Sequence, residues 1–131
     1  MNKITTDAIE WIKNYFKTTN GRKAVIGISG GKDSTVVAAL CAKALGAENG
    51  VGVLMPNGVQ SDIADSELVV KTLGIESLVV NIQYAFMNLV NQINEKHISS
   101  QAQINMPPRL SMTVLYKLRS EERFSRNAET D

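Results

Sequence analysis

The sequence Ser29-Gly30-Gly31-Lys32-Asp33-Ser34 separates a short apolar run from an amphipathic segment. The apolar run, residues 24–28, has the composition of a strand that is covered on both faces. Two adjacent glycines permit a tight turn with positive φ and a close approach of a ligand to the backbone. We therefore expect a buried strand, a tight turn and a helix that begins near Ser34.

The rest of the chain continues this alternation of strands and helices. We expect strands at 24–28, 51–55 and 78–80, a polar loop at 101–107, and helices at 5–17, 34–45, 62–73, 83–97 and 108–119. Pro108 is expected to open the last helix, because proline is favoured at a first helical position. This order predicts an α/β fold in which a parallel sheet carries helices on both faces. In the first helix an apolar arc is expected to pack on the core: Ile4, Ala8, Trp11, Ile12 and Tyr15.

Length and composition favour a single globular domain. The chain has 131 residues, of which 44% are hydrophobic and 21% are charged. The net charge of +1 gives no basic excess of the kind that nucleic-acid binders usually show. There is no apolar run of the roughly 18 residues that a membrane span needs, and no secretion signal at the N-terminus. We expect a cytoplasmic protein that has neither a nucleic-acid nor a membrane partner.

The glycine-rich turn has the chemistry of a phosphate site. Successive backbone N–H groups at a helix N-terminus form an anion-binding concavity. Ser29 and Ser34 add hydroxyl donors, whereas the carboxylate of Asp33 beside phosphates makes sense if it holds Mg²⁺. The alternative is a plain strand-to-helix turn, in which the glycines serve geometry and the polar residues cap the helix.

Two familiar nucleotide motifs do not match. The Walker A pattern requires a glycine where Ile26 stands and a serine or threonine where Asp33 stands. The dinucleotide-binding pattern Gly-x-Gly-x-x-Gly fits residues 27–30 no better.

The turn resembles the pyrophosphate loop of the N-type ATP pyrophosphatases, whose signature is Ser-Gly-Gly-x-Asp-Ser. Enzymes of that superfamily cleave ATP between its α and β phosphates. The resemblance implies that Asp33 is a magnesium ligand and that Lys32 occupies the variable position, either near the phosphates or in solvent. It also implies that the pyrophosphate end of ATP is held by Ser29, Gly30, Gly31 and Ser34.

Two further segments resemble the ammonia-dependent NAD synthetases within that superfamily. Residues 54–62 are similar to the segment after the second strand, and residues 105–116 are similar to an Asn-x-x-x-Arg-x-Arg-Met helix start. The resemblance implies a three-layer sandwich of the adenine nucleotide alpha-hydrolase type over residues 1–119. It implies that Asn105 and Arg109 contact deamido-NAD and that Gln60 contacts ATP, although Gln60 also fits an ordinary turn.

The resemblance also implies a reaction, namely the amidation of deamido-NAD to NAD with ammonia. A carboxylate is a poor acyl donor, so ATP first adenylates it, and AMP and pyrophosphate are released. The substrates would be ATP, deamido-NAD and ammonia, with Mg²⁺ as the metal and a homodimer as the assembly. No side chain is assigned a catalytic role.

The chain departs from that family in two ways. Ser111 stands where the family has the second arginine of Arg-x-Arg, which removes a cation directed at ATP. Family members are also about twice as long, and their next strand carries a glutamate as second magnesium ligand. Here residues 120–131 form a polar tail, so the chain resembles a truncated member with one unpaired sheet edge. A non-catalytic ATP-binding module and another ATP pyrophosphatase, such as a tRNA-modifying enzyme, remain alternatives.

Several other polar residues have structural interpretations. Arg109 also fits a solvated helix end. Asp62 and Asp65 are expected to cap and charge a helix N-terminus rather than bind a metal. The single cysteine, Cys41, excludes an intrachain disulfide and is expected to be buried among apolar residues. His97 is expected to be structural.

Overall fold

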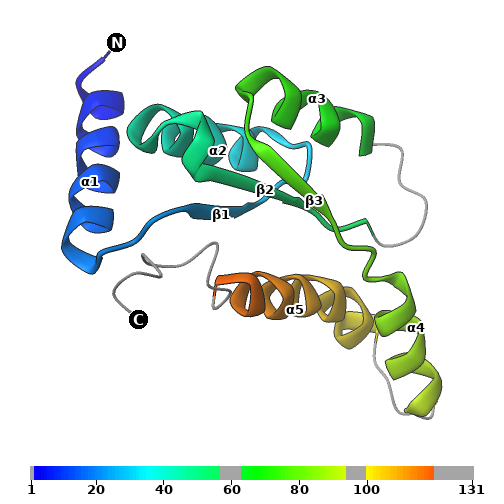
Figure 1. Cartoon of the computed structure of the whole chain (residues 1–131). Coiled ribbons are helices and arrows are strands. Elements are labelled where there is room, and N and C mark those ends of the chain that lie inside the picture. The colour runs from blue at the N-terminus through cyan, green and yellow to red at the C-terminus, as the bar shows by residue number, and fades with distance from the viewer. Residues whose placement is uncertain (1, 57–62, 94–99, 120–131) are drawn as a thin grey trace.

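The computed structural model describes residues 2–56, 63–93 and 100–119. Three strands alternate with helices along this part of the chain (Figure 1). In chain order the elements are α1 (Lys3–Thr19), β1 (Ala24–Gly27), α2 (Lys32–Leu45), the short 3₁₀ helix η1 (Ala47–Asn49), β2 (Gly50–Leu54), α3 (Ile63–Leu73), β3 (Glu76–Val79), α4 (Gln83–Gln92) and α5 (Ser100–Arg119).

The strands form one parallel sheet in the order β1-β2-β3. In its register Val51 of β2 is opposite Val25 of β1 on one side and Glu76 of β3 on the other. α2 and α3 cover one face of the sheet, and α5 covers the opposite face (Figure 1). The predicted α/β architecture, a parallel sheet with helices on both faces, is confirmed.

The central strand β2 is buried along its whole length. Val51 and Val53 are fully buried on the face toward α5, where Val114, Leu115 and Leu118 pack against them. Parallel strands that are covered on both faces need such nearly continuous apolar sequences, which is why the strand could be located from sequence.

The other face of β2 fits closely against α3 and the residues that follow it. A Cβ on Gly52 would lie 2.7 Å from Cγ1 of Val70 and 3.2 Å from Cδ1 of Ile75. Only glycine leaves room for this approach. Leu54, two residues on, is 1% exposed and belongs to the main core cluster.

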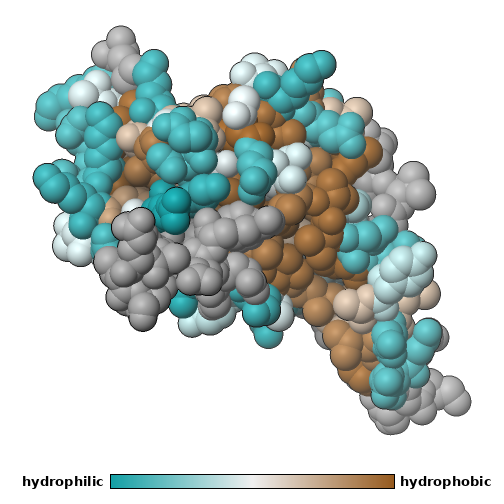
Figure 2. All heavy atoms as spheres, in the orientation of Figure 1, coloured by the Kyte–Doolittle hydropathy of each residue, from teal (hydrophilic) through white to brown (hydrophobic). Residues whose placement is uncertain are grey.

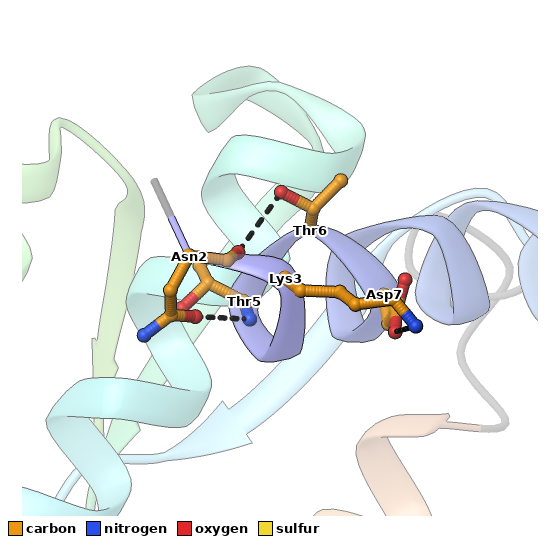
Figure 3. Close-up of polar contacts among 5 residues, drawn as sticks. All are labelled: Asn2, Lys3, Thr5, Thr6 and Asp7. Carbon is orange, nitrogen blue, oxygen red and sulfur yellow. Dashed lines mark hydrogen bonds and ion pairs between the residues drawn. The ribbon is translucent and has the colours of Figure 1, made fainter.

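Local sequence signals account for the start of α1. The Oδ1 atom of Asn2 accepts a hydrogen bond from the backbone N–H of Thr5 at 2.8 Å, and the Thr6 hydroxyl donates to the Asn2 carbonyl at 3.1 Å (Figure 3). An exposed ion pair between Lys3 and Asp7, 3.7 Å long, lies on the same turn (Figure 3). Asparagine is among the preferred N-cap residues, because its side chain satisfies an N–H group that lacks a partner in the helix.

The predicted ends of α2 at residue 45 and of α3 at residue 73 are confirmed, whereas α1 continues two residues beyond its predicted end. Asn20 closes α1 in the left-handed region with φ of 57°, and Gly46 follows α2 with φ of 92°. Gly74 follows α3 with φ of 70°. Glycine and asparagine adopt positive φ at lower cost than other residues, which is why they mark helix ends in the sequence.

The orientation predicted for α1 is partly wrong. Ile4, Trp11 and Tyr15 are 80%, 64% and 52% exposed, whereas Ile9 is buried and Ile12 packs against the core. α1 lies beside α2 at the margin of the fold (Figure 1), so only one side of its apolar arc meets other elements. The arc marks an amphipathic helix, but its width does not reveal which part is covered.

The loop predicted at 101–107 is also wrong, because α5 begins at Ser100 and contains Pro107 and Pro108. A proline inside a helix lacks one backbone donor and crowds the preceding turn, which is why the sequence favoured a boundary there. Here the two prolines lie within the helix, and their side chains line a cleft described below.

Three smaller predictions have mixed outcomes. Cys41 is buried as expected, and burial raises the pKa of its thiol, so that it packs as a small apolar residue. α4 ends at Gln92 rather than at residue 97, and His97 lies outside the described residues. No helix in the described part of the chain combines the length and the apolar character that crossing a bilayer would require.

Candidate functional site

The glycine-rich turn joins the end of β1 to the start of α2. Gly30 has φ of 87°, so it supplies the positive φ expected of the turn. Gly31 is the N-cap residue of α2, and no side-chain capping hydrogen bond is made at this position. The first turn of α2 therefore presents backbone N–H groups and the positive end of the helix dipole at this place.

Ser29 and Ser34 meet across the turn. Their hydroxyl oxygens are 3.0 Å apart, and the backbone N–H of Ser29 donates to Oγ of Ser34 at 3.2 Å. The N–H of Gly31 donates to Oγ of Ser29 at 3.2 Å. The structure thus brings together the two hydroxyl groups that the sequence assigned to phosphate binding.

Thr35 is a member of this cluster that the sequence analysis missed. Its hydroxyl donates to the carbonyl oxygen of Gly31 at 2.7 Å, and its backbone N–H donates to the same oxygen at 3.2 Å. These bonds fix the carbonyl of the N-cap residue. A threonine four residues after a glycine is too common to have marked this role.

Lys32 and Asp33 are the first two residues of α2, and both are exposed. A carboxylate in a first helical turn is favoured by the helix dipole. In the described residues no group of three or more His, Cys, Asp or Glu side chains gathers as a protein-only metal cage. Asp33 as a single carboxylate fits the way Mg²⁺ is usually held, by one or two carboxylates together with phosphate oxygens and water.

A cleft of about 330 Å³ lies beside the turn at the carboxyl ends of β1 and β2. This is where ligands bind in parallel sheets of this kind. Its walls come from the residues that follow β1, β2 and β3 and from α3 and α5, and they are mostly apolar. The lining residues are Ile28, Ser29, Met55, Pro56, Ile63, Ser66, Ile82, Pro107, Pro108 and Ser111.

Ser66 is the buried polar residue of this cleft. It is 3% exposed, and its hydroxyl donates to the carbonyl oxygen of Ile28 at 3.4 Å. The bond ties α3 to the last residue before the turn. The sequence analysis missed Ser66 because a serine inside an amphipathic helix is usually solvated.

α5 places its three candidate residues differently. Ser111 lines the cleft together with Ser29. Asn105 and Arg109 are exposed on the same helix and are not among the residues that line the cleft.

The segment after β2 carries the remaining candidates. Gln60 and Asp62 lie outside the described residues. Asp65 is exposed in the first turn of α3, where the helix dipole favours a carboxylate.

Comparisons with known proteins agree on one family. The family model described as NAD synthase matches residues 4–124. The NH(3)-dependent NAD(+) synthetase of Finegoldia magna is 36% identical over 115 residues, which are 87% of this chain and 47% of that protein. The enzyme of the same name from Thermococcus sibiricus is 32% identical, over 87% of this chain and 44% of that protein.

Solved structures give the same result. The NH3-dependent NAD synthetase from Campylobacter jejuni, in complex with the nitrate ion, superposes with a TM-score of 0.83 and 28% identity, covering 92% of this chain and 53% of that one. The NMN synthetase from Francisella tularensis superposes with a TM-score of 0.80 and 25% identity, covering 93% of this chain and 50% of that one.

The chain spans about half the length of the curated relatives that it matches. The residues that the family model matches, 4–124, include the turn, the cleft and the whole of α5. On the family match, the sequence identity and the shared fold together, the chain belongs to the NAD synthase family.

Proposed function

We propose that this chain carries the ATP-binding half of an enzyme that amidates deamido-NAD to NAD with ammonia. The observation that supports this most directly is the cluster of Ser29 and Ser34 hydroxyls on the uncapped N-terminus of α2. It lies beside the cleft at the carboxyl ends of the parallel strands. An anion site next to an apolar cleft suits a nucleotide, whose phosphates and base need those two environments.

The turn would hold the pyrophosphate end of ATP. The N–H group of Gly30, with the Ser29 and Ser34 hydroxyls, would supply donors for phosphate oxygens. Asp33 would hold Mg²⁺, which when bound neutralises the charge that builds up on the phosphates. Lys32, the residue before Asp33, is exposed, and its positive charge would attract the negatively charged nucleotide at longer range.

Asn105 and Arg109 would serve the deamido-NAD side, because both are exposed on α5 away from the cleft wall. Their helix also carries Ser111 into the cleft, so one rigid element spans both regions. Attack of the substrate carboxylate on the α-phosphate of ATP would break the bond between the α and β phosphates, giving the adenylated carboxylate and pyrophosphate. Ammonia would then attack the acyl carbon and displace AMP. Gln60, outside the described residues, is proposed for the ATP side.

A turnover assay tests the proposal. The purified chain is incubated with ATP, Mg²⁺, deamido-NAD and ammonium, and the products are separated by chromatography. We expect AMP and NAD in equal amounts, and only when ammonium and deamido-NAD are both present. A folded chain that binds ATP but forms no AMP would instead be a non-catalytic ATP-binding module. A chain that does not bind ATP would contradict both functions.

We further propose that the chain acts in the cytoplasm as a homodimer. Figure 2 shows an apolar band over β3 that continues toward α4. Exposed apolar residues on these two elements are Val79, Met87 and Leu89, and Ile93 follows them. Exposed apolar surface of this kind is typical of protein interfaces. Equilibrium sedimentation measures the assembly directly.

Ser111→Arg is expected to raise the affinity for ATP about tenfold, which is about 1.4 kcal/mol. Ser111 lines the cleft beside Ser29, so a guanidinium there would add charge-assisted hydrogen bonds to the triphosphate. Ser77→Arg on β3, an exposed position outside the cleft, changes the net charge equally and serves as the control. Isothermal titration calorimetry with ATP and Mg²⁺ compares the two variants. Equal affinities would show that position 111 does not act on ATP.

A further inference from the structure

The peptide unit between Ile28 and Ser29 leads from β1 into the glycine-rich turn, and its two polar groups have different partners. The carbonyl oxygen of Ile28 accepts the hydroxyl of Ser66 on α3 at 3.4 Å. The N–H of Ser29 donates to Oγ of Ser34 at 3.2 Å. One unit of backbone therefore connects a buried side chain of α3 with a hydroxyl group of the turn.

This peptide unit moves as a whole. The atoms of a peptide unit lie in one plane, and in the trans form the C=O and N–H groups point in opposite directions. The described residues contain no cis peptide bond. A hydrogen bond that fixes the direction of the Ile28 carbonyl therefore also fixes the direction of the Ser29 N–H, to which the Ser34 oxygen is bonded.

The rest of Ile28 is already held in place. Its N–H donates to the carbonyl of Val53 on β2 at 2.9 Å, and the residue is 4% exposed. Rotation about ψ of Ile28 is then the main freedom that can tilt the next peptide plane. The Ser66 bond restrains this rotation, and because Ser66 is 3% exposed, water competes little for the carbonyl.

The same bond also affects the Ser34 hydroxyl electronically. A carbonyl that accepts a hydrogen bond makes the N–H of its own peptide unit a better donor. A hydroxyl has one proton and two acceptor lone pairs, so the Ser34 oxygen that accepts the Ser29 N–H still has its proton to donate. A phosphate oxygen at the turn would receive that proton in a hydrogen bond.

We propose that Ser66 is a positioning residue for phosphate binding. Through the peptide unit between Ile28 and Ser29, it holds the Ser34 hydroxyl in the orientation that donates to a phosphate oxygen. The inference rests on the proposed function, in which the turn holds the pyrophosphate end of ATP. The Ser66 bond also joins α3 to the residue after β1, so the experiment has to separate positioning from stability.

The experiment measures the two parts of the nucleotide separately on the full chain. Isothermal titration calorimetry gives the affinities for magnesium pyrophosphate and for adenosine. Ser66→Ala should weaken the binding of pyrophosphate about tenfold, because the peptide plane that orients Ser34 is released. It should leave the affinity for adenosine within about twofold, because the base does not depend on the turn.

Three further variants control for stability and volume. Cys41→Ala also removes one buried heavy atom, from a residue that is 8% exposed on α2 and does not line the cleft. It should leave both affinities within about twofold. Ser66→Thr keeps the hydroxyl and should restore pyrophosphate binding. If Ser66→Ala does not fold, Ser66→Cys takes its place, because a thiol keeps the volume and is only a weak donor.

Amide hydrogen exchange followed by NMR gives a readout that a general loss of stability would not produce. In Ser66→Ala the N–H of Ser29 should exchange about tenfold faster, because its peptide plane is no longer held. The N–H of Ile28 should stay within about twofold, because its bond to Val53 remains. A loss of stability alone would speed both neighbouring amides by the same factor.

The inference is overturned if the folded Ser66→Ala chain binds pyrophosphate as tightly as the native chain. It is also overturned if both probes weaken by the same factor, which would make the role of Ser66 structural, or if adenosine alone weakens, which would place Ser66 at the base. A native chain that binds neither pyrophosphate nor ATP contradicts the proposed function together with this inference. A native chain that binds ATP without turnover leaves the comparison of variants decisive, so the two can fail separately.

Discussion

Asp33→Asn is expected to abolish the Mg²⁺ dependence of ATP binding and to lower any turnover about a hundredfold. Asp33 is exposed in the first turn of α2, two residues after the N-cap Gly31. Asparagine has nearly the same shape but lacks the charge that holds a hard cation. Calorimetry with ATP, in Mg²⁺ and in EDTA, gives the measurement. The native chain should bind ATP more tightly with the metal, and the variant should bind equally in both buffers.

Asp65→Asn is the control for that experiment. Asp65 is likewise an exposed carboxylate in the first turn of a helix, α3, and it does not line the cleft. The Asp65→Asn substitution removes the same charge from the first turn of a helix as Asp33→Asn does. The Asp65 variant should keep the Mg²⁺ dependence of ATP binding. If the Asp33 variant also kept the Mg²⁺ dependence, the assignment of Asp33 as the magnesium ligand would be wrong.

Leu54→Ala is expected to lower the free energy of unfolding by about 2–5 kcal/mol. Leu54 is 1% exposed at the end of the central strand and belongs to the main core cluster. Truncation removes buried methyl groups and leaves a cavity between the sheet and its helices. Because small domains are stable by only about 5–15 kcal/mol, this is a large share of the total.

Urea unfolding followed by far-ultraviolet circular dichroism measures this effect. Leu68→Ala is the matched control, because Leu68 is 62% exposed on α3. Its loss should change the free energy of unfolding by no more than about 0.5 kcal/mol. Equal losses in the two variants would contradict the burial of Leu54 in the sheet.

The fold was predictable where burial constrains which residue types the sequence can contain. The apolar runs at 24–28 and 51–55 located β1 and β2, because strands covered on both faces tolerate few polar residues. The helix ends expected at 45 and 73 are each followed by a glycine, Gly46 and Gly74, and both glycines adopt positive φ in the structure. The exposure of Trp11 was not predictable, since it depends on how far α1 lies from the sheet rather than on its own pattern. The helix through Pro107 was not predictable either, because proline normally argues against one.

The candidate site was predictable in its central part only. Ser29, Gly30 and Ser34 stood in one short motif whose chemistry is local, and the structure places the two hydroxyls 3.0 Å apart. Ser66 and Thr35 contribute through bonds to the carbonyls of Ile28 and Gly31. Such bonds depend on where a distant helix packs or on the exact pitch of a turn. A sequence pattern does not contain that information.

The bonds among Ser29, Gly31, Ser34 and Thr35 have a thermodynamic consequence for ligand binding. They hold the backbone of the turn in one conformation without any anion present. A phosphate that binds there does not have to order the loop, so little conformational entropy is lost at the moment of binding. The hydroxyl groups need only rotate their protons from each other toward the ligand. We therefore expect phosphate recognition to be fast and to proceed on a preorganised surface.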